Sequence, residues 1–364
     1  MIYKVTVYIP DEKRHSPYVV KGLIELEKMG YISLNFRSIS FSVHNRVTFE
    51  NDKFREQKKS YPWCIELDVF NTKSKRKVRI GIDLQDWEGL FSKHSINHCD
   101  IVYKRAVNKE GLKKLNKLKP DFFKRFGPNY NVRLKDTRFS FFYKLSSFKS
   151  NFKKVFITPK KVLHKLYSIF HSENDIKINS SNKIVYSIQK PPNYDYIFFQ
   201  VKYYDWDNKF SKSVNDSRKN IITCLKENFG EKFIGGMYYK KPLPIDFQQC
   251  QTNVEPDFNN YKNFVKNASI VISSNGFGNS IPWKLIEYMK WGCCIVSEKN
   301  KHSFRISPKL GVLEFFENEN ELIKKCRMLL GKKKIIDDYK SKSKDYFSNN
   351  LNPKAVMKSI IENS

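Results

Sequence analysis

The sequence predicts an α/β protein made of two doubly wound, Rossmann-like domains. Its 364 residues suffice for two domains of ordinary size, each with its own core. In both halves, short apolar runs alternate with segments whose apolar residues recur at helical spacing, which is typical of parallel sheets covered by helices. A proline-rich break, "QKPPNYD" at 189–195, separates the halves. We therefore expect a first domain at 1–190 and a second at 191–364.

The first domain opens with a strand, a helix and a second strand. The runs "IYKVTVYI" (2–9) and "ISLNFRSI" (32–39) are rich in β-branched and aromatic residues. Between them, "PYVVKGLIELEKMG" has helical spacing, with Pro17 suited to a first turn and Gly30 to a C-terminal stop. Further strands are expected at "WCIELDVF", "KVRIGIDL" (77–84) and "CDIVYKRAV", and a helix is favoured in "PKKVLHKLYSIF" (159–170).

The second domain repeats this alternation. Strands are expected at "YIFFQVKYYDW", "KFIGGMYY", "IVISS", "CCIVSE" and "GVLEFF". Helices are expected at "DSRKNIITCLKENFG", "NNYKNFVKNAS", "SIPWKLIEYMKWG", about 319–330, 333–347 and "NPKAVMKSIIEN". Strand and helix alternate in the order that a parallel sheet requires.

The composition is that of a folded globular protein, with 40% hydrophobic and 15% aromatic residues. The N-terminus lacks the pattern of a secretory signal, and no apolar run approaches the roughly 18 residues of a membrane span. The 7 cysteines form no Cys-x-x-Cys pair. We therefore expect a soluble, cytoplasmic protein whose cysteines are reduced and lie in its core.

The formal net charge of +30 favours polyanionic partners. It is concentrated in the segment 109–171, which holds 17 Lys or Arg, 3 Asp or Glu and 13 Phe or Tyr. Three interpretations stay open for this basic aromatic segment. It can be a solvated lysine-rich face over a phenylalanine-rich core, a surface that docks on an anionic membrane, or a nucleic-acid-binding surface.

A glycine-containing loop between a predicted strand and a predicted helix is the strongest candidate binding site. Its sequence, "SNGFGNS", contains Gly276 and Gly278, and Ser280 is suited to cap the helix that follows. Lys284 falls in the first helical turn, where a cation opposes the helix dipole unless an anion lies nearby. Glu287, one turn later, can accept hydrogen bonds from hydroxyls. A phosphate-plus-sugar ligand fits these residues, and an ordinary loop with Lys284 in solvent is the alternative.

The same stretch carries a family resemblance. "SIPWKLIEYMKWGCCIVSE" resembles the donor-site segment of nucleotide-sugar glycosyltransferases with the GT-B fold, in particular those that build bacterial capsule and lipopolysaccharide O-antigen. Three other segments resemble the same group, at 80–107, 197–208 and 217–239. The resemblance implies two Rossmann-like domains that face each other across a cleft. It also implies sugar transfer from a nucleoside-diphosphate donor to a growing, lipid-linked surface glycan at the inner face of the membrane.

The resemblance implies roles for residues at matching positions. Glu287 matches the glutamate that holds the donor's ribose, while Lys284 and Lys202 match cations that neutralise the diphosphate, with Arg218 assisting. Gly276, Gly278 and Ser280 complete the implied donor site. Such cations stabilise the departing diphosphate without a metal, and we expect neither a metal nor a cofactor. "DWD" at 205–207 only superficially resembles a metal-binding motif.

One departure from the family pattern leaves the stereochemistry open. Many retaining members have an earlier glutamate where this chain has Asn279, or Asn275 if the glycines are aligned. An inverting enzyme needs a base in the first domain to deprotonate the acceptor hydroxyl. The candidates are Asp86 and Asp83, which follow the "RIGI" run, and His15 and Asp11, in the loop after the first strand. A non-enzymatic, basic nucleic-acid-binding protein is the alternative from another class.

Overall fold

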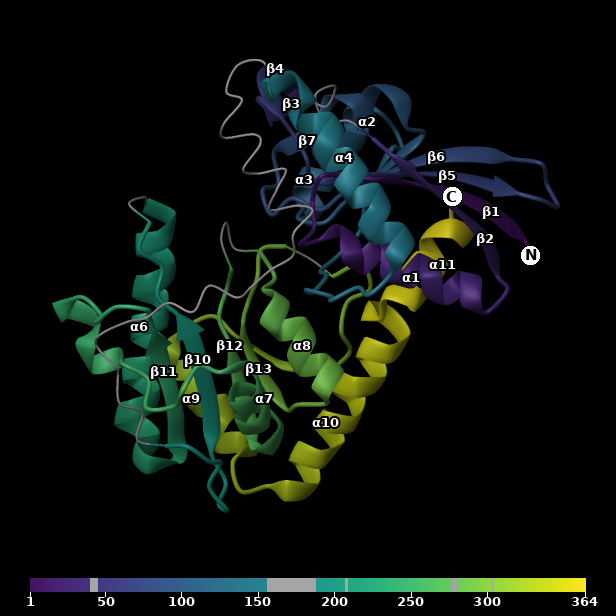
Figure 1. Cartoon of the computed structure of the whole chain (residues 1–364). Coiled ribbons are helices and arrows are strands. Elements are labelled where there is room, and N and C mark those ends of the chain that lie inside the picture. The colour runs from purple at the N-terminus through teal and green to yellow at the C-terminus, as the bar shows by residue number, and fades with distance from the viewer. Residues whose placement is uncertain (40–44, 156–187, 207–208, 277–279, 303) are drawn as a thin grey trace. The chain divides into compact units, whose positions relative to one another are not determined.

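The computed structural model describes residues 1–39, 45–155, 188–206, 209–276, 280–302 and 304–364 (Figure 1). The chain forms two compact units. The first comprises Met1–Ile178, His302–Arg305 and Leu351–Ser364, and the second comprises Asn179–Lys301 and Ile306–Asn350. The division differs from the predicted one because the last residues of the chain join the first unit. The helix expected at 159–170 lies outside the described residues.

The main sheet of the first unit is six-stranded, in the order β2-β1-β5-β6-β8-β9. β5 is antiparallel to both of its neighbours, whereas the other pairs are parallel. The sheet is therefore mixed, not wholly parallel as predicted, because β5 and β6 form a hairpin across a short polar turn. The strands are β1 (Tyr3–Ile9), β2 (Ile32–Ser38), β5 (Cys64–Asn71), β6 (Lys77–Asp83), β8 (Ile101–Lys104) and β9 (Phe123–Arg125).

A second sheet of the first unit, β4-β3-β7, was not among the expected elements. β3 (Asn45–Glu50) and β4 (Lys53–Ser60) form a hairpin, and β7 (Leu90–Ser92) pairs with β3. The hairpin turns at Asn51 and Asp52, which both have positive φ, as a two-residue type I′ turn requires. β4 is so rich in charged residues that its apolar pattern gives no strand signal, and only the Asn-Asp pair marks the turn.

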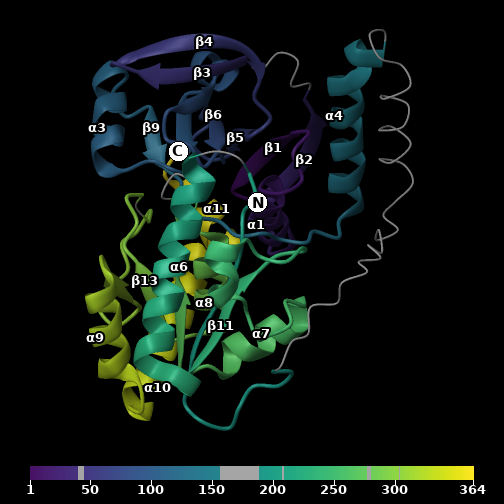
Figure 2. The ribbon, with the colours of Figure 1, turned by 90° about the vertical axis from the view of Figure 1, so that its left-hand side faces the viewer.

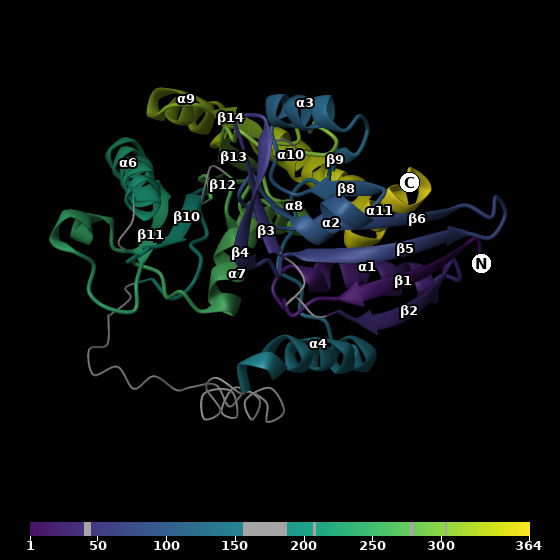
Figure 3. The same cartoon turned by 90° about the horizontal axis from the view of Figure 1, so that it is seen from above.

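Helices flank the main sheet of the first unit. α1 (Ser16–Lys28) packs on β2 and on α11 (Pro353–Glu362), the last helix of the chain. α4 (Thr137–Val155) lies alongside the edge strand β2 (Figures 2 and 3). α2 (Lys93–His98) and α3 (Lys109–Leu118) complete the set.

The sheet of the second unit is parallel throughout, in the order β11-β10-β12-β13-β14. Numbered along the chain, this is the doubly wound order 2-1-3-4-5, whose direction of winding reverses between β10 and β12. The predicted α/β class is confirmed, with a Rossmann-like sheet in this unit. The strands are β10 (Ile197–Lys202), β11 (Phe233–Tyr238), β12 (Ile270–Ser273), β13 (Ile295–Glu298) and β14 (Glu314–Phe316).

Helices of the second unit cover both faces of its sheet. α6 (Lys209–Phe229) packs with α9 (Glu319–Leu329), and α8 (Trp283–Trp291) packs with α10 (Lys333–Tyr346). α7 (Phe258–Asn267) contacts α8 through ring contacts between Tyr261 and Trp291. Short helical segments are η2 (Gly230–Lys232), η3 (Ile245–Cys250) and η5 (Phe347–Leu351).

The cysteines and the helix lengths bear on two expectations from the sequence, reduced cysteines in the core and no membrane span. All cysteines are free and buried, as predicted. No helix in the described part of the chain has the length and apolar character needed to cross a bilayer.

The packing of α1 on α11 depends on Gly22. A Cβ atom there would lie 2.3 Å from the carbonyl oxygen of Pro353 and 2.7 Å from Cγ of Met357. Gly22→Ala must therefore displace α11, and we expect a loss of about 1–3 kcal/mol in the free energy of unfolding. The measurement is the denaturant midpoint, with Lys21→Ala on the same helix as control. Equal midpoints for the two variants would show that α11 is held loosely.

Candidate functional site

The candidate site of the second unit lies where the winding of its sheet reverses. In open α/β sheets, ligands bind beyond the carboxyl ends of the strands at this reversal. Here that place is the end of β10 and β12, reached by Gln200 and Ser273. Three predicted donor-site residues gather around the end of β10: Lys202, Arg218 and Lys284.

Lys284 points onto this strand end, not into solvent. Its Nζ donates to the carbonyl oxygen of Gln200 at 2.6 Å, and it lies 4.6 Å from the ring centre of Tyr261 and 5.9 Å from that of Tyr238. Burial, and then the nearby charge of Arg218, lower the pKa of Lys284 to about 7, while Glu287 acts in the opposite direction. The ammonium is thus poorly compensated by the protein and would be stabilised by an anion.

Arg218 brings a second cation to the same strand end from α6. It is 7% exposed, and its Nη1 donates to the carbonyl oxygen of Lys202 at 2.7 Å. The guanidinium carbon lies 4.8 Å from the ring centre of Tyr204, and the two backbone groups of Tyr204 are bonded to the side chain of Asn215. Burial lowers the pKa of Arg218. Lys202 itself is exposed at the end of β10.

The loop before α8 differs from its predicted form at the helix start. α8 begins at Trp283 with Pro282 as its N-cap, so Ser280 does not cap it. Ser280 is instead buried, and its carbonyl oxygen accepts the N–H of Gly276 at 2.9 Å, which closes the loop on itself. A Cβ at Gly276 would lie 2.8 Å from Oγ of Ser280, so a larger residue there would displace the Ser280 side chain. Gly278 and Asn279 lie outside the described residues.

Two carboxylates stand near these cations. Glu287 lies one turn after Lys284 and is half-buried; burial raises its pKa, against the lowering effect of Lys284 and Lys290. Sequence reasoning missed the second one, Glu298 at the end of β13. Its Oε2 accepts the backbone N–H of Asn275 at 2.8 Å. Glu298 reaches the loop from the neighbouring strand, a pairing that no local sequence signal shows.

Two buried polar atoms at the strand ends lack a hydrogen-bond partner among the described residues. They are Oγ of Ser273 and Oε1 of Gln200. The other end of the Gln200 side chain is fixed, because its Nε2 donates to Thr252 and to the carbonyl oxygen of Val254. Buried polar atoms are usually satisfied by protein, water or ligand.

At the carboxyl edge of the first unit's sheet, two predicted base candidates lie beside a buried arginine. Arg105, which sequence reasoning missed, pairs with Asp86 and donates from Nε to Oδ1 of Asn129 at 2.6 Å. Burial, and then the charge of Arg105, lower the pKa of His15 to about 3. An imidazole whose protonated form is so disfavoured is a weak base, which counts against His15 as the base. The half-buried Asp11 lies in the same loop as His15.

Asp83 lies in a closed network. Its Oδ1 accepts a hydrogen bond from Nζ of Lys104 at 2.8 Å, and the hydroxyl of Tyr61 lies 3.0 Å from both carboxylate oxygens. All three side chains are at most 1% exposed. Burial raises the pKa of Asp83, and Lys104 opposes that effect. This geometry ties β6 to β8 and leaves Asp83 without access to an acceptor in this arrangement.

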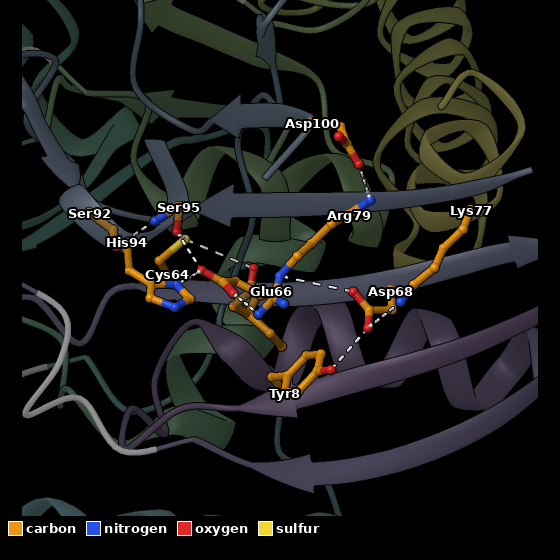
Figure 4. Close-up of polar contacts among 11 residues, drawn as sticks. Tyr8, Cys64, Glu66, Asp68, Lys77, Arg79, Ser92, His94, Ser95 and Asp100 are labelled. Carbon is orange, nitrogen blue, oxygen red and sulfur yellow. Dashed lines mark hydrogen bonds and ion pairs between the residues drawn. The ribbon is translucent and has the colours of Figure 1, made fainter. Parts of the chain in front are cut away.

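A second buried carboxylate of the first unit, Glu66, holds α2 on the sheet (Figure 4). It accepts bonds from Arg79 at 2.7 Å and from Ser95 at 2.8 Å, and it lies 2.9 Å from Nδ1 of His94. Figure 4 shows these side chains converging on Glu66 from β6 and α2. Since Glu66 is 1% exposed and fully engaged, its role is to fix α2.

No group of three or more His, Cys, Asp or Glu among the described residues is arranged to hold a metal ion. Asp205 of the "DWD" motif is exposed and contacts the hydroxyl of Tyr239, and Asp207 lies outside the described residues. Metal independence stays a prediction.

Comparison with known proteins adds little beyond the architecture. No protein-family model matches the chain, and no curated protein matches it. Similar solved structures include the C-terminal domain of a group 1 glycosyl transferase, LpcC, from Francisella tularensis, at 16% identity over 44% of this chain and 87% of that one, with a TM-score of 0.32.

A glycosyltransferase from Rickettsia africae aligns at 14% identity over 74% of this chain and 77% of that one, with a TM-score of 0.33. A sucrose-phosphate synthase from Thermosynechococcus elongatus aligns at 10% identity over 94% and 91%, with a TM-score of 0.35. Similarities of this size carry no argument.

The lowered pKa of Lys284 predicts a pH-dependent stability. Between about pH 7 and 10.5 the unfolded chain keeps this proton while the folded protein loses it, so unfolding takes up a proton and stability rises with pH. Relative to Lys284→Met, wild type should gain up to about 1.4 kcal/mol in unfolding free energy per pH unit in this window. Denaturant titrations near pH 7 and near pH 9 measure the difference.

Lys266→Met, at an exposed position of α7, is the matched control and should follow the pH trend of wild type. If Lys284→Met follows that trend too, the ammonium of Lys284 is not desolvated and the described geometry is incorrect.

Proposed function

We propose that this chain is a glycosyltransferase of the GT-B type, which transfers a sugar from a nucleoside-diphosphate donor to a growing, lipid-linked cell-surface glycan. The observation that carries the proposal is the pair of cations, Lys284 and Arg218, held at the strand end where the sheet winding reverses. Their nearest carboxylate on α8, Glu287, lies one turn beyond Lys284. This arrangement fits a ligand that combines a diphosphate with hydroxyl groups.

The chemistry of sugar transfer gives these cations a task. Breaking the bond between the sugar and the diphosphate leaves negative charge on the departing phosphate, and fixed cations stabilise that charge as it develops. Lys284 and Arg218 are held by backbone carbonyl oxygens, so little reorganisation is needed. Lys202, exposed beside them, can add a third charge, and Glu287 can accept the ribose hydroxyls. These cations would neutralise the charge of the diphosphate, a task for which other transferases use a metal ion.

The acceptor side of the proposal rests on the first unit. A base must take the proton of the acceptor hydroxyl if the reaction inverts the sugar's configuration. Asp86 is the favoured candidate, since the protonated form of His15 is destabilised and Asp83 is enclosed. The ion pair with Arg105 orients Asp86.

Membrane association, the remaining part of the proposal, is supported by the outer face of α4. Phe141 is 62% and Phe148 is 38% exposed, and their spacing of seven places them on one side of the helix. The exposed Lys149 lies beside them. Exposed rings with adjacent cations are suited to an anionic bilayer surface, where rings enter the interface and lysines meet head groups. We therefore propose that the protein acts at the inner leaflet, where a lipid-linked acceptor is presented.

Nucleotide binding tests the donor site. UDP, GDP, CDP and dTDP are each added to purified protein, and the melting temperature is measured. A nucleotide at 100 times its dissociation constant should stabilise the fold by roughly 2.7 kcal/mol. Glu287→Gln, which keeps the side-chain shape, should remove most of that shift, whereas Glu227→Gln at an exposed position of α6 should keep it. If no nucleotide shifts wild type, and RNA binds instead in a salt-sensitive way, the donor site is refuted.

Liposome sedimentation tests the membrane surface. Phe141→Ser combined with Phe148→Ser should reduce binding to vesicles of phosphatidylglycerol and phosphatidylcholine by about tenfold, because both rings would leave the interface. Ile306→Ser combined with Leu310→Ser, which removes exposed apolar side chains of the second unit, is the control. Equal losses for both pairs, or equal binding of wild type to neutral vesicles, would count against docking through α4.

A further inference from the structure

A cavity of about 690 Å³ lies in the second unit, next to the candidate donor site. Lys284 is not among its lining residues. Three segments line it: the residues after β10, the first turns of α6, and the loop after β11 that continues into η3. It therefore opens beyond the carboxyl ends of β10 and β11, on the side of β10 away from β12. Its volume falls in the range of small-molecule sites.

Aromatic rings form the wall of this cavity. Tyr203 packs edge-to-face against Tyr239 at 5.4 Å and against Phe247 at 5.2 Å between ring centres, which makes a fixed aromatic cluster. Trp206 lies 5.5 Å from Tyr204 and is 58% exposed, so much of its ring can meet a ligand. Ring faces of this kind attract the positively polarised C–H edges of flat apolar or sugar rings.

Charged groups are distributed around the aromatic wall. In the described part of the chain, four lysines from α6 and the loop after β11 line the cavity: Lys209, Lys212, Lys219 and Lys241. Of the three aspartates among the described lining residues, Asp205 accepts a hydrogen bond from the hydroxyl of Tyr239 and keeps its charge; the other two are Asp216 and Asp246. Among the described lining residues, lysines outnumber aspartates by four to three, and this excess of positive charge favours an anionic ligand. Two aspartates can still accept hydrogen bonds from hydroxyl groups.

Tyr204 connects the cavity with the donor site. Its ring lines the cavity and also lies against the guanidinium of Arg218, which is bonded to the end of β10. Asn215 holds the backbone of Tyr204 from both sides. A ligand in the cavity would thus lie beside the cation that we assign to the diphosphate.

We propose that this cavity binds an anionic saccharide, a sugar or short glycan that carries carboxylate or phosphate groups. Aromatic faces for the ring, lysines for the negative charge and aspartates for the hydroxyls are the combination that such a ligand requires. The inference rests on the proposed sugar transfer and deepens it, because it assigns a charge to the sugar. Two sources share this chemistry, the sugar part of the donor and the glycan acceptor.

Calorimetric titration of the full chain with tetragalacturonate, and with uncharged maltotetraose, tests the proposal. Wild type should bind the charged oligosaccharide at least about tenfold more tightly than the neutral one. Lys212→Ala combined with Lys241→Ala removes two exposed cavity lysines and should weaken tetragalacturonate binding by about tenfold or more. Trp206→Ala should also weaken it, since the exposed ring would be lost.

The control is Lys232→Ala combined with Lys266→Ala, two exposed lysines of the same unit outside the cavity, which lowers the net charge equally. It should keep wild-type affinity. If the control loses as much affinity as the cavity variant, the attraction comes from the net charge of the protein and the proposal is overturned. Wild-type affinity in the cavity variant, or equal binding of maltotetraose, would overturn it as well.

Competition separates the two sources. If UDP-glucuronate displaces tetragalacturonate but UDP does not, the cavity binds the sugar of the donor. If neither nucleotide displaces tetragalacturonate, the cavity binds the acceptor. The test of the cavity and the test of the donor site can also fail separately. If tetragalacturonate binding depends on the cavity residues but no nucleotide raises the melting temperature, this inference stands and the proposed transferase is refuted. If a nucleotide raises the melting temperature but tetragalacturonate binding does not depend on the cavity residues, the transferase stands and this inference is overturned.

Discussion

The ammonium of Lys284, held on the carbonyl oxygen of Gln200, is the contact on which the candidate site depends. It brings a cation to a strand end where Arg218 already supplies another, and the two repel each other. One carbonyl, two ring faces and the carboxylate of Glu287 compensate this charge only in part. Burying poorly compensated cations costs stability, and an anion between them would relieve that cost.

Buried charges in the first unit are arranged differently. Asp83 is paired with Lys104, and Glu66 with Arg79, and further hydrogen bonds occupy these carboxylates. Removing one partner of such a pair is expected to be strongly destabilising, because the other charge would stay buried. These networks hold strands and helices together and have no need of a ligand. Asp86, about one third exposed beside its arginine, is less enclosed than these two carboxylates.

Local patterns predicted most of the strands and helices that the structure contains. The parallel sheet of the second unit follows from alternating apolar runs and amphipathic helices, each of which shows in a short window of sequence. The direction of β5 and the charged strand β4 were missed, since both depend on pairing with neighbouring strands. The helix cap at Ser280 was misplaced because its carbonyl oxygen is bonded to Gly276, a contact that overrides the residue's local preference.

By itself, the sequence determined the α/β class, the reduced state of the cysteines and the spacing that puts Lys284 and Glu287 one turn apart on a helix. Only the tertiary structure decided where Lys284 points, because its partner Gln200 lies 84 residues away in the chain. The same holds for Arg105 beside Asp86 and for the aromatic cavity, whose walls come from three segments. Local preferences act over a few residues, whereas a site is made by side chains that only packing brings together.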